Sequence, residues 1–425
     1  MKIKEARAYQ ILDSRGRPTV ACRITLEDGS NHAARVPSGA STGRHEALEL
    51  RDHGTPLAER FYGGSSVFQA VKNVNEIIAA RIVGMDAKLE KVDDLLVELD
   101  PTPNHGALGA NAKLSVSLAT AIAEAHAAGN SLARHLAGPG PLQIPMPMVN
   151  VLSGGAHANR TLDIQDVLVI PHRASSFTEA LSWIAAIRET ATKLGRAQGL
   201  VTHLVADEGG LGIPFLSVAA ACDFVVRCIS EVGLAPGKDV SLALDFAATQ
   251  YFENDNYQLR SEGLKLDPVS YQRHILNLVN TQPIVSIEDP FAEDDWISWQ
   301  LFSASAPKGL QILGDDLFTT NMQRLEQGIE TKAANAILIK VNQNGLVSHT
   351  AAALTRAQEA NFKTIVSARS GETEDSWLAD LAIGWRAGQI KVGSTHGSER
   401  TAKWNRLLEI EATEESSFAR PFAKL

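Results

Sequence analysis

The middle of the chain contains three short apolar segments that each end in a carboxylate. The clearest covers residues 284–287, where mostly β-branched residues predict a buried strand, and it stops at Glu288. The same design recurs at 241–247 (SLALDFA) and at 311–317 (QILGDDL). In parallel α/β folds, ligand and metal sites form at strand ends, because the strand fixes the backbone while the next loop opens to a cleft. One acidic strand end could be a solvated turn, whereas three in succession predict an α/β fold with an acidic site.

Composition limits the size of the fold and the class of partner. The 425 residues are 44% hydrophobic and 21% charged, which predicts one large and one smaller domain. The net charge of -9 argues against nucleic acid or an anionic membrane as the main partner. An anionic small molecule stays compatible, because local cations or a bound metal can override the overall charge.

The three cysteines and the N-terminus indicate the compartment. The cysteines form neither a disulfide framework nor a zinc-binding spacing, and the first residues contain no apolar segment of signal or spanning length. We therefore expect a soluble, cytoplasmic protein.

Residues 1–136 are predicted to form an N-terminal α+β domain. Strands are expected at 3–20, 21–26 and 32–36, and helical spacing covers 65–99 and 111–136. Between strand and helix lies the small-residue loop 37–43 (PSGASTG). It is either a lid whose hydroxyls reach an anion or metal, or an ordinary surface connection. It lacks the GK[ST] ending of a nucleotide phosphate loop.

Residues 137–425 are predicted to form a modified (β/α)8 TIM-like barrel, which gives an α/β fold class overall. The domain starts at a linker with two prolines and two glycines. Strands are expected at 146–151, 167–170, 203–206, 242–244, 284–287, 312–313, 336–339, 364–366 and 390–392, and helices at 177–194, 218–232 and 348–360. A doubly wound open sheet is the alternative, although no GxGxxG motif opens a helix here.

Polar residues border most of these strands and are expected to point into one mouth. They are Gln165, Asp166, Glu208, Asp245, Glu288, Asp315, Lys340, Arg369, Ser370 and Lys391. Each alone is more often a helix cap or a surface ion pair, but their joint occurrence around one rim predicts an active site.

This ring of side chains indicates a reaction class. Carboxylates on successive strands without His or Cys suit Mg²⁺. Lys340 and Lys391 would repel a shared metal and each other, which lowers an amine pKa and frees one lysine as a base. Such a base could abstract the proton α to a metal-held carboxylate, with Glu208 as the acid that expels a β-hydroxyl. Arg369 and Ser370 are typical of a phosphate or carboxylate clamp. The predicted reaction is a β-elimination on a small phosphorylated acid.

The sequence resembles the enolase family along nearly its whole length. The matching motifs, in order, are DSRGRPTV, VPSGASTG, LGANA, NVLSGGAHA, ADEGG, SIEDPFAEDDW, GDDL, KVNQ, ARSGETED and SER. The resemblance implies an N-terminal α+β domain that carries a lid, a modified barrel, two Mg²⁺ ions, and a homodimer or higher homo-oligomer. It implies a small anionic phosphorylated acid as ligand, with neither nucleic acid nor membrane as partner.

The resemblance also implies a role for each matching residue. The catalytic set is Lys340 as base, Glu208 as acid, Lys391 beside the substrate carboxylate, Asp166 and His157. The substrate-binding set is Arg369, Ser370, Gln165, Ser41 and Lys391. The metal-binding set is Asp245, Glu288 and Asp315, with the lid residue Ser41 joining the second ion.

Two positions in the expected site depart from the family pattern. Asp166 stands where enolases carry a glutamate, which retracts the carboxylate by about 1.5 Å. Ala368 stands where enolases carry a histidine, which leaves extra volume and one donor fewer beside the clamp.

These departures leave three functions open. The first is the removal of water from 2-phosphoglycerate. The second is a specialised activity on a bulkier or differently charged phosphorus group, as in carboxyphosphonoenolpyruvate synthase of phosphinothricin-type antibiotic pathways. The third is a binding or structural role without catalysis. Retention of so many buried charges weighs against this third function.

Overall fold

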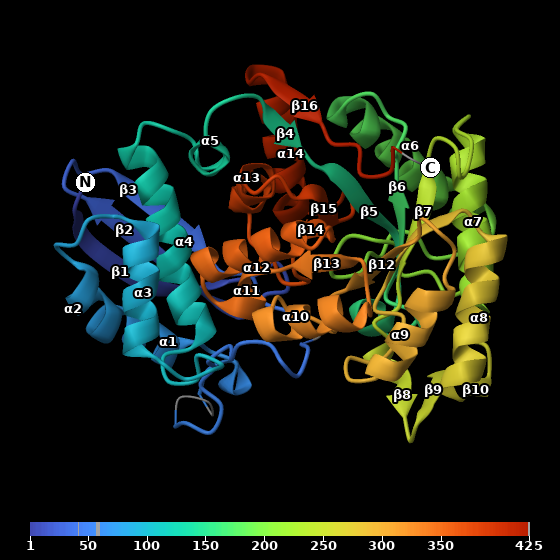
Figure 1. Cartoon of the computed structure of the whole chain (residues 1–425), viewed down its shortest axis with the longest axis horizontal. Coiled ribbons are helices and arrows are strands. Elements are labelled where there is room, and N and C mark those ends of the chain that lie inside the picture. Colours follow the sequence, from blue (N-terminus) through green and yellow to red (C-terminus); the bar gives the residue numbers. More distant parts are fainter. Residues whose placement is uncertain (41, 57–59, 424–425) are drawn as a thin grey trace.

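The computed structural model describes residues 1–40, 42–56 and 60–423. An antiparallel sheet at the N-terminus contains β1 (Ile3–Leu12), β2 (Pro18–Leu26) and β3 (Asn31–Arg35) in that order. The long helix α4 (Ala110–Ala127) packs on β2 and β3 and is buried over most of its length. Figure 1 shows this blue and cyan α+β unit beside the larger barrel, so the predicted fold class is confirmed.

The other N-terminal helices are shorter than the apolar spacing predicted. They are η1 (Tyr62–Gly64), α1 (Phe68–Lys72), η2 (Asn73–Ile78), α2 (Ala79–Ile82), α3 (Leu89–Leu99) and α5 (Leu132–Ala137). The segment 65–99, predicted to be helical, contains several helices, and the chain turns after α2 through Gly84 at φ +87°. Gly129, at φ +73°, likewise separates α4 from α5. The domain boundary predicted at 136–137 falls at the end of α5.

Eight strands close into a barrel in the order β11-β12-β13-β14-β15-β5-β6-β7. Their bounds are β5 (Met146–Ser153), β6 (Asp166–Ile170), β7 (Ser241–Asp245), β11 (Ile284–Glu288), β12 (Gln311–Gly314), β13 (Ala336–Ile339), β14 (Lys363–Ser367) and β15 (Gly388–Gly393). Strand β6 runs antiparallel to both its neighbours, and the remaining pairs are parallel. The first residue of β6 therefore lies at the same end of the barrel as the last residues of the other strands.

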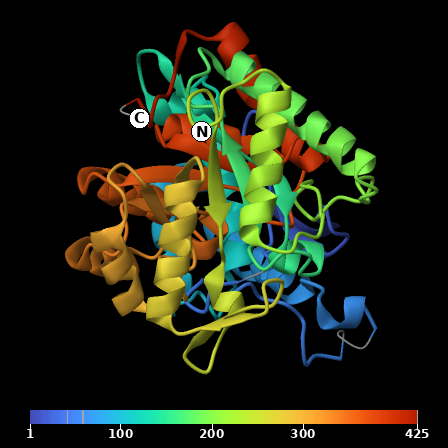
Figure 2. The ribbon, with the colours of Figure 1, turned by 90° about the vertical axis from the view of Figure 1, so that its right-hand side faces the viewer.

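Helices and two small sheets surround the barrel (Figures 1 and 2). The helices are η3 (Gly155–Ala158), α6 (Phe177–Ala197), α7 (Val218–Glu231), η4 (Ala248–Tyr251), α8 (Pro268–Thr281), α9 (Trp296–Ser305), α10 (Met322–Thr331), α11 (Val341–Asn344), α12 (Val347–Glu359), α13 (Trp377–Gly384) and α14 (Ser398–Thr413). The small sheets contain β8 (Phe252–Glu253), β9 (Asn256–Leu259) and β10 (Leu264–Leu266), and β4 (Leu142–Ile144) with β16 (Ser416–Phe418).

The strand predicted at 203–206 is wrong. This segment is a loop in which only Val205 makes an isolated bridge, to Leu211. The barrel closes without it, and the side chains of Leu204 and Val205 are exposed instead of buried. The apolar run alone could not reveal that no neighbouring strand is available to pair with it.

The N-terminal domain is fixed against the barrel mouth by polar contacts. Ser38 and Gly371 exchange two backbone hydrogen bonds of 2.8 and 2.9 Å. Asp93 on α3 accepts a hydrogen bond from the backbone nitrogen of Ser348 on α12. These contacts place the loop that follows β3 over the acidic strand ends. In the described part of the chain, no helix is long and apolar enough to cross a bilayer.

Candidate active site

Three carboxylates lie at the ends of neighbouring barrel strands. Asp245 ends β7, Glu288 ends β11, and Asp315 directly follows β12. The strand register pairs Glu288 with Asp245 on one side and with Leu313 on the other. All three side chains are buried, so the structure brings the predicted metal-binding residues to one rim.

Two lysines, buried Lys391 and partly buried Lys340, balance the charge of these carboxylates. The Nζ atom of Lys391 on β15 donates to Asp245 Oδ2 at 2.7 Å and to both oxygens of Glu288 at 2.8 Å. Lys340, directly after β13, forms an ion pair with Asp315. Burial and the charge of Asp245 raise the pKa of Glu288 well above its ordinary range. The rim therefore favours a positive partner at each carboxylate.

Direct contact with carboxylates raises the pKa of both lysines. The predicted lowering of an amine pKa beside a shared metal stays a prediction. Burial lowers the pKa of Lys340, but the charge of Asp315 outweighs burial and leaves the pKa raised. The pKa of Lys391 is raised well above its ordinary value, since Asp245 and Glu288 outweigh the burial that opposes them. The direct carboxylate partners therefore decide the direction of both pKa shifts.

The residues at this rim fit a hard divalent cation. Oxygen donors dominate, and the like charges of Asp245, Glu288 and Asp315 are compensated by the ammonium groups of Lys340 and Lys391. In the described part of the chain, two groups have possible ligand atoms within 4.8 Å of one another. They are Asp289 with Asp315 and Asp316, and His157 with Asp166 and Glu208. Asp245, Glu288 and Asp315 do not form such a group in the described part of the chain, where the amines of Lys391 and Lys340 contact them.

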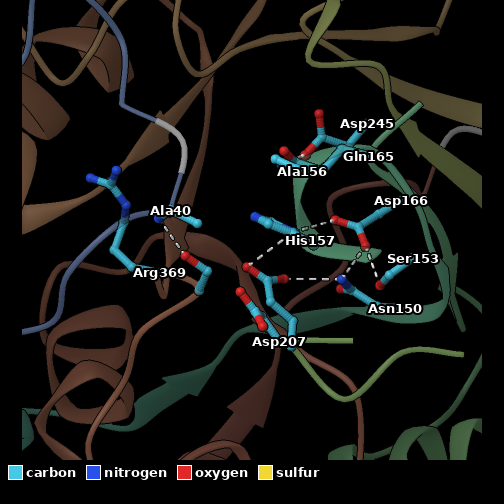
Figure 3. A network of polar contacts seen from close by, with 12 residues as sticks. Ala40, Asn150, Ser153, Ala156, His157, Gln165, Asp166, Asp207, Asp245 and Arg369 are labelled. Atoms are coloured by element: carbon cyan, nitrogen blue, oxygen red, sulfur yellow. Dashed lines mark hydrogen bonds and ion pairs between the residues drawn. The ribbon is translucent and has the colours of Figure 1, made fainter. Parts of the chain in front are cut away.

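The predicted clamp lies beside the lysines and is engaged by the N-terminal domain. Arg369 donates to both carboxylate oxygens of Glu46 at 2.8 and 3.2 Å, and to Asn342 Oδ1 at 3.0 Å. The hydroxyl of Ser370 accepts a 2.6 Å hydrogen bond from the backbone nitrogen of Ala40. Figure 3 shows Arg369 and Ala40 together on one side of the site. Glu46 thus occupies the position of an anionic ligand on the guanidinium.

Helix α14 fixes the backbone of the clamp. Arg400, which is fully buried, donates to the backbone oxygens of Arg369, Ser370 and Val392. These contacts give the SER motif at 398–400 a physical role.

A second polar cluster faces the clamp across the site (Figure 3). The amide nitrogen of Asn150 bridges Asp166 Oδ1 at 2.6 Å and Glu208 Oε2 at 3.0 Å. Ser153 also donates to Asp166 Oδ1 at 2.6 Å. His157 Nδ1 lies 3.9 Å from Asp166 Oδ2 and from Glu208 Oε1. Neither Asp166 Oδ2 nor His157 Nδ1 has a hydrogen-bond partner among the described residues.

This cluster holds a proton more readily on Asp166 than on Glu208. Burial, followed by the charge of Glu208, raises the pKa of Asp166 well above its ordinary range. Burial also favours the neutral form of Glu208, but the charges of His157, Arg400 and Lys391 outweigh burial and lower its pKa. Glu208, the predicted acid, thus shares its buried surroundings with Asp166, which also belongs to the predicted catalytic set.

The site is almost filled by its own side chains. A cavity of about 10 Å³ remains, and it is lined by Glu208, both lysines, Ala368 and Arg369. The extra volume expected beside Ala368 is therefore not open while the lysines contact the carboxylates and Glu46 contacts Arg369. A cavity of about 740 Å³ lies next to it, and Glu46 and Asn342 are among its lining residues.

Sequence reasoning missed three polar residues of this site. Asn150 and Ser153 lie in the NVLSGGAHA motif, which was noted only for its resemblance value, and Glu46 follows the small-residue loop. Their partners are 13 to 323 residues away in the chain, so no local pattern indicated the contacts. Gln165 lies where it was expected and donates to Asp245 Oδ2 at 3.0 Å. Ser41, the predicted lid serine, lies outside the described residues.

Comparison with known protein families covers both parts of the chain. The family described as "Enolase, N-terminal domain" matches residues 3–136. The family described as "Enolase, C-terminal TIM barrel domain" matches residues 141–420. Together with the closed barrel and the acidic rim, these matches show that the chain belongs to the enolase family.

Proposed function

We propose that the protein is a Mg²⁺-dependent lyase that removes water from 2-phosphoglycerate, or from a close phosphorus-containing analogue, to give a phosphoenolpyruvate-type product. One observation carries the proposal. Two lysine amines contact three buried carboxylates at one barrel rim, directly beside an arginine and serine clamp. This combination supports abstraction of a proton α to a carboxylate on a phosphorylated acid.

In this proposal the substrate carboxylate binds at the acidic rim, where Mg²⁺ and Lys391 would supply positive charge. Asp245, Glu288 and Asp315 would hold Mg²⁺, which supplies positive charge where negative charge develops on that carboxylate. With a cation held there, the amine of Lys391 would be free to pair with the substrate carboxylate instead of with Asp245 and Glu288. The amine of Lys391 would thus exchange carboxylates of the protein for the carboxylate of the substrate.

Lys340 is the proposed base. Its amine contacts Asp315, and that contact favours the charged ammonium. A cation held by Asp315 would weaken this stabilisation and so favour the neutral amine of Lys340. The neutral Nζ then accepts the α-proton, and the electron pair of the broken C–H bond moves to the substrate carboxylate.

The residues that face the clamp across the site, Glu208 and Asp166, act on the β-hydroxyl in this proposal. Glu208 lines the cavity, while Asp166 lies behind it and shares the amide of Asn150. One proton held by this pair passes through Glu208 to the leaving oxygen, and the C–O bond breaks with loss of water. The unpartnered Nδ1 of His157 adds a polar contact on the same side.

The phosphoryl group takes the place of Glu46 on the clamp. Glu46 Oε1 also accepts a 2.9 Å hydrogen bond from the backbone nitrogen of Gly43, at the end of the loop that follows β3. Displacement of Glu46 from Arg369 by a phosphoryl anion is therefore coupled to that loop. Ser370 presents its hydroxyl to the same anion.

A second candidate function is a carboxyphosphonoenolpyruvate synthase-type activity. The observation that favours it is the fixed position of Asp166. Asn150 and Ser153 both donate hydrogen bonds to its Oδ1 atom, which keep the short side chain away from the centre of the site. Ala368 lines the cavity with a methyl group only. A site altered on both the leaving-group side and the phosphoryl side suits a changed substrate.

A purely structural role receives less support. Lys391, Glu288 and Asp166 are all buried in the mouth, and burying such charges is costly unless a ligand or metal uses them.

Removal of the proposed base tests the elimination directly. Lys340→Met should lower kcat for 2-phosphoglycerate with Mg²⁺ by about 10³-fold, because general-base catalysis is lost. The control is Lys363→Met, since Lys363 begins β14 at the opposite end of the barrel and lies over the ring of Phe422. The measurement is formation of the enol product by ultraviolet absorbance. Equal rates for the wild type and Lys340→Met would contradict the assignment.

The position of Asp166 separates the two candidate functions. If the site is specialised, Asp166→Glu, alone and with Ala368→His, should raise kcat/KM for 2-phosphoglycerate by at least about tenfold, because the carboxylate then reaches the leaving group. Steady-state kinetics with 2-phosphoglycerate give the answer. Asp94→Glu, on the exposed face of α3, controls for the added methylene. Turnover by the wild type at about 10 s⁻¹ or faster would remove the case for specialisation.

The contact between Glu46 and Arg369 predicts competition with phosphate. Glu46→Gln should tighten binding of inorganic phosphate roughly tenfold, because the anion no longer displaces a charged partner. Isothermal titration calorimetry measures this affinity. Glu49→Gln is the matched control, since Glu49 contacts Ser38 and Arg51 and not the clamp. Unchanged or weaker phosphate binding in Glu46→Gln would show that Glu46 does not compete.

A further inference from the structure

Gln250 connects the proposed metal ligand Asp245 to the loop that carries His157. Its Oε1 accepts a 3.1 Å hydrogen bond from the backbone nitrogen of Ala156, and its Nε2 donates to Gln165 Oε1 at 2.9 Å. Gln165 Nε2 in turn donates to Asp245 Oδ2 at 3.0 Å. Figure 3 shows Ala156, Gln165 and Asp245 together at this side of the site. Three hydrogen bonds thus lead from a backbone amide to the carboxylate.

The backbone N–H of Ala156 determines which atoms donate and which accept in these three hydrogen bonds. A backbone N–H can only donate, so Gln250 must present its oxygen to Ala156 and its NH₂ group to Gln165. Gln165 must then accept with its oxygen and donate with its own NH₂ group to Asp245. Without Gln250, both orientations of the Gln165 amide become possible. One of them would put a carbonyl oxygen against the carboxylate.

The backbone around this contact is built for a close approach. Gly155 adopts φ +48°, and a Cβ atom there would lie 3.2 Å from the Cα of Gln165 and 3.3 Å from Gln250 Oε1. Asp163, in the same loop, accepts backbone hydrogen bonds from Arg260 and Ser261 at 3.0 and 2.9 Å. The loop is therefore fixed at both ends of the contact.

We propose that Gln250 is a positioning residue that sets the orientation of the Gln165 amide and thereby the metal affinity of Asp245. The inference rests on the proposed metal site and adds a residue that contacts neither metal nor substrate. Partners of this kind, which orient a ligand through a hydrogen bond, typically change metal affinity by about 10- to 100-fold.

Position 250 is suitable for substitution because its side chain borders a cavity. Gln250 is half-buried and lines a cavity of about 330 Å³ together with Gln258. Gln258 donates to Glu253 at 3.1 Å, and among the described residues its side chain forms no hydrogen bond with Gln250, Gln165 or Asp245. The two glutamines share a cavity and a chemistry, so Gln258 provides a matched control.

Gln250→Glu is the sharpest test, because two effects oppose each other. Simple electrostatics predicts tighter Mg²⁺ binding from the added negative charge. Our inference predicts weaker binding, because a carboxylate can only accept, so Gln165 must turn its NH₂ group toward position 250 and its oxygen toward Asp245. Isothermal titration with Mg²⁺ alone measures the dissociation constant, and melting without Mg²⁺ checks that each variant is folded.

We expect Gln250→Glu to raise the Mg²⁺ dissociation constant at least about tenfold, and Gln250→Met to raise it by a smaller factor. Gln258→Glu and Gln258→Met should stay within about twofold of the wild type. Unchanged or tighter Mg²⁺ binding in Gln250→Glu would overturn the inference. If that variant does not fold, unchanged affinity in Gln250→Met overturns it instead. A wild-type protein that binds no Mg²⁺ would overturn the proposed metal site together with this inference.

Discussion

The concentration of negative charge at one end of the barrel is the constraint on which the rest of the structure depends. Asp245, Glu288 and Asp315 come from adjacent strands, and each is buried where water cannot screen its neighbours. Such a rim is stable only with positive partners, and removing one partner of a buried pair typically costs roughly 3–5 kcal/mol. Lys391 and Lys340 fill that role here. The same need for positive charge makes the rim suitable for a divalent cation, so stability and the proposed chemistry have one physical origin.

The topology then decides which other groups reach this rim. Because β6 runs antiparallel to its neighbours, its first residue, Asp166, pairs with Asp245 and Ser153 at the active end of the barrel. A parallel strand would have placed that residue at the far end. The N-terminal domain completes the site from outside, since Glu46 contacts Arg369 through an ion pair that links two domains. The site is thus assembled from the barrel, its loops and the domain that precedes it.

The barrel and the acidic rim could be predicted because both are local in sequence: a short apolar segment and the carboxylate that ends it are neighbours in the chain. The contacts that orient the carboxylates could not be predicted, because Asn150 bridges residues 16 and 58 positions away, and Gln250 reaches one 85 positions away. The predicted strand at 203–206 failed for a related reason, since strand formation needs a partner that the segment itself does not reveal. The ion pair between Lys340 and Asp315, which raises the pKa of Lys340, was likewise not indicated by the local sequence, because its members are 25 residues apart.

Thermal melting with and without Mg²⁺ tests the central claim, that the buried carboxylates form a cation site, most directly. Melting midpoints would be measured in EDTA and in increasing Mg²⁺, for the wild type and for Glu288→Gln. The account predicts a midpoint that rises with Mg²⁺, equivalent to about 2.7 kcal/mol at one hundred times the dissociation constant, and a much smaller rise in Glu288→Gln. A wild-type midpoint that stays unchanged at high Mg²⁺ would contradict the claim.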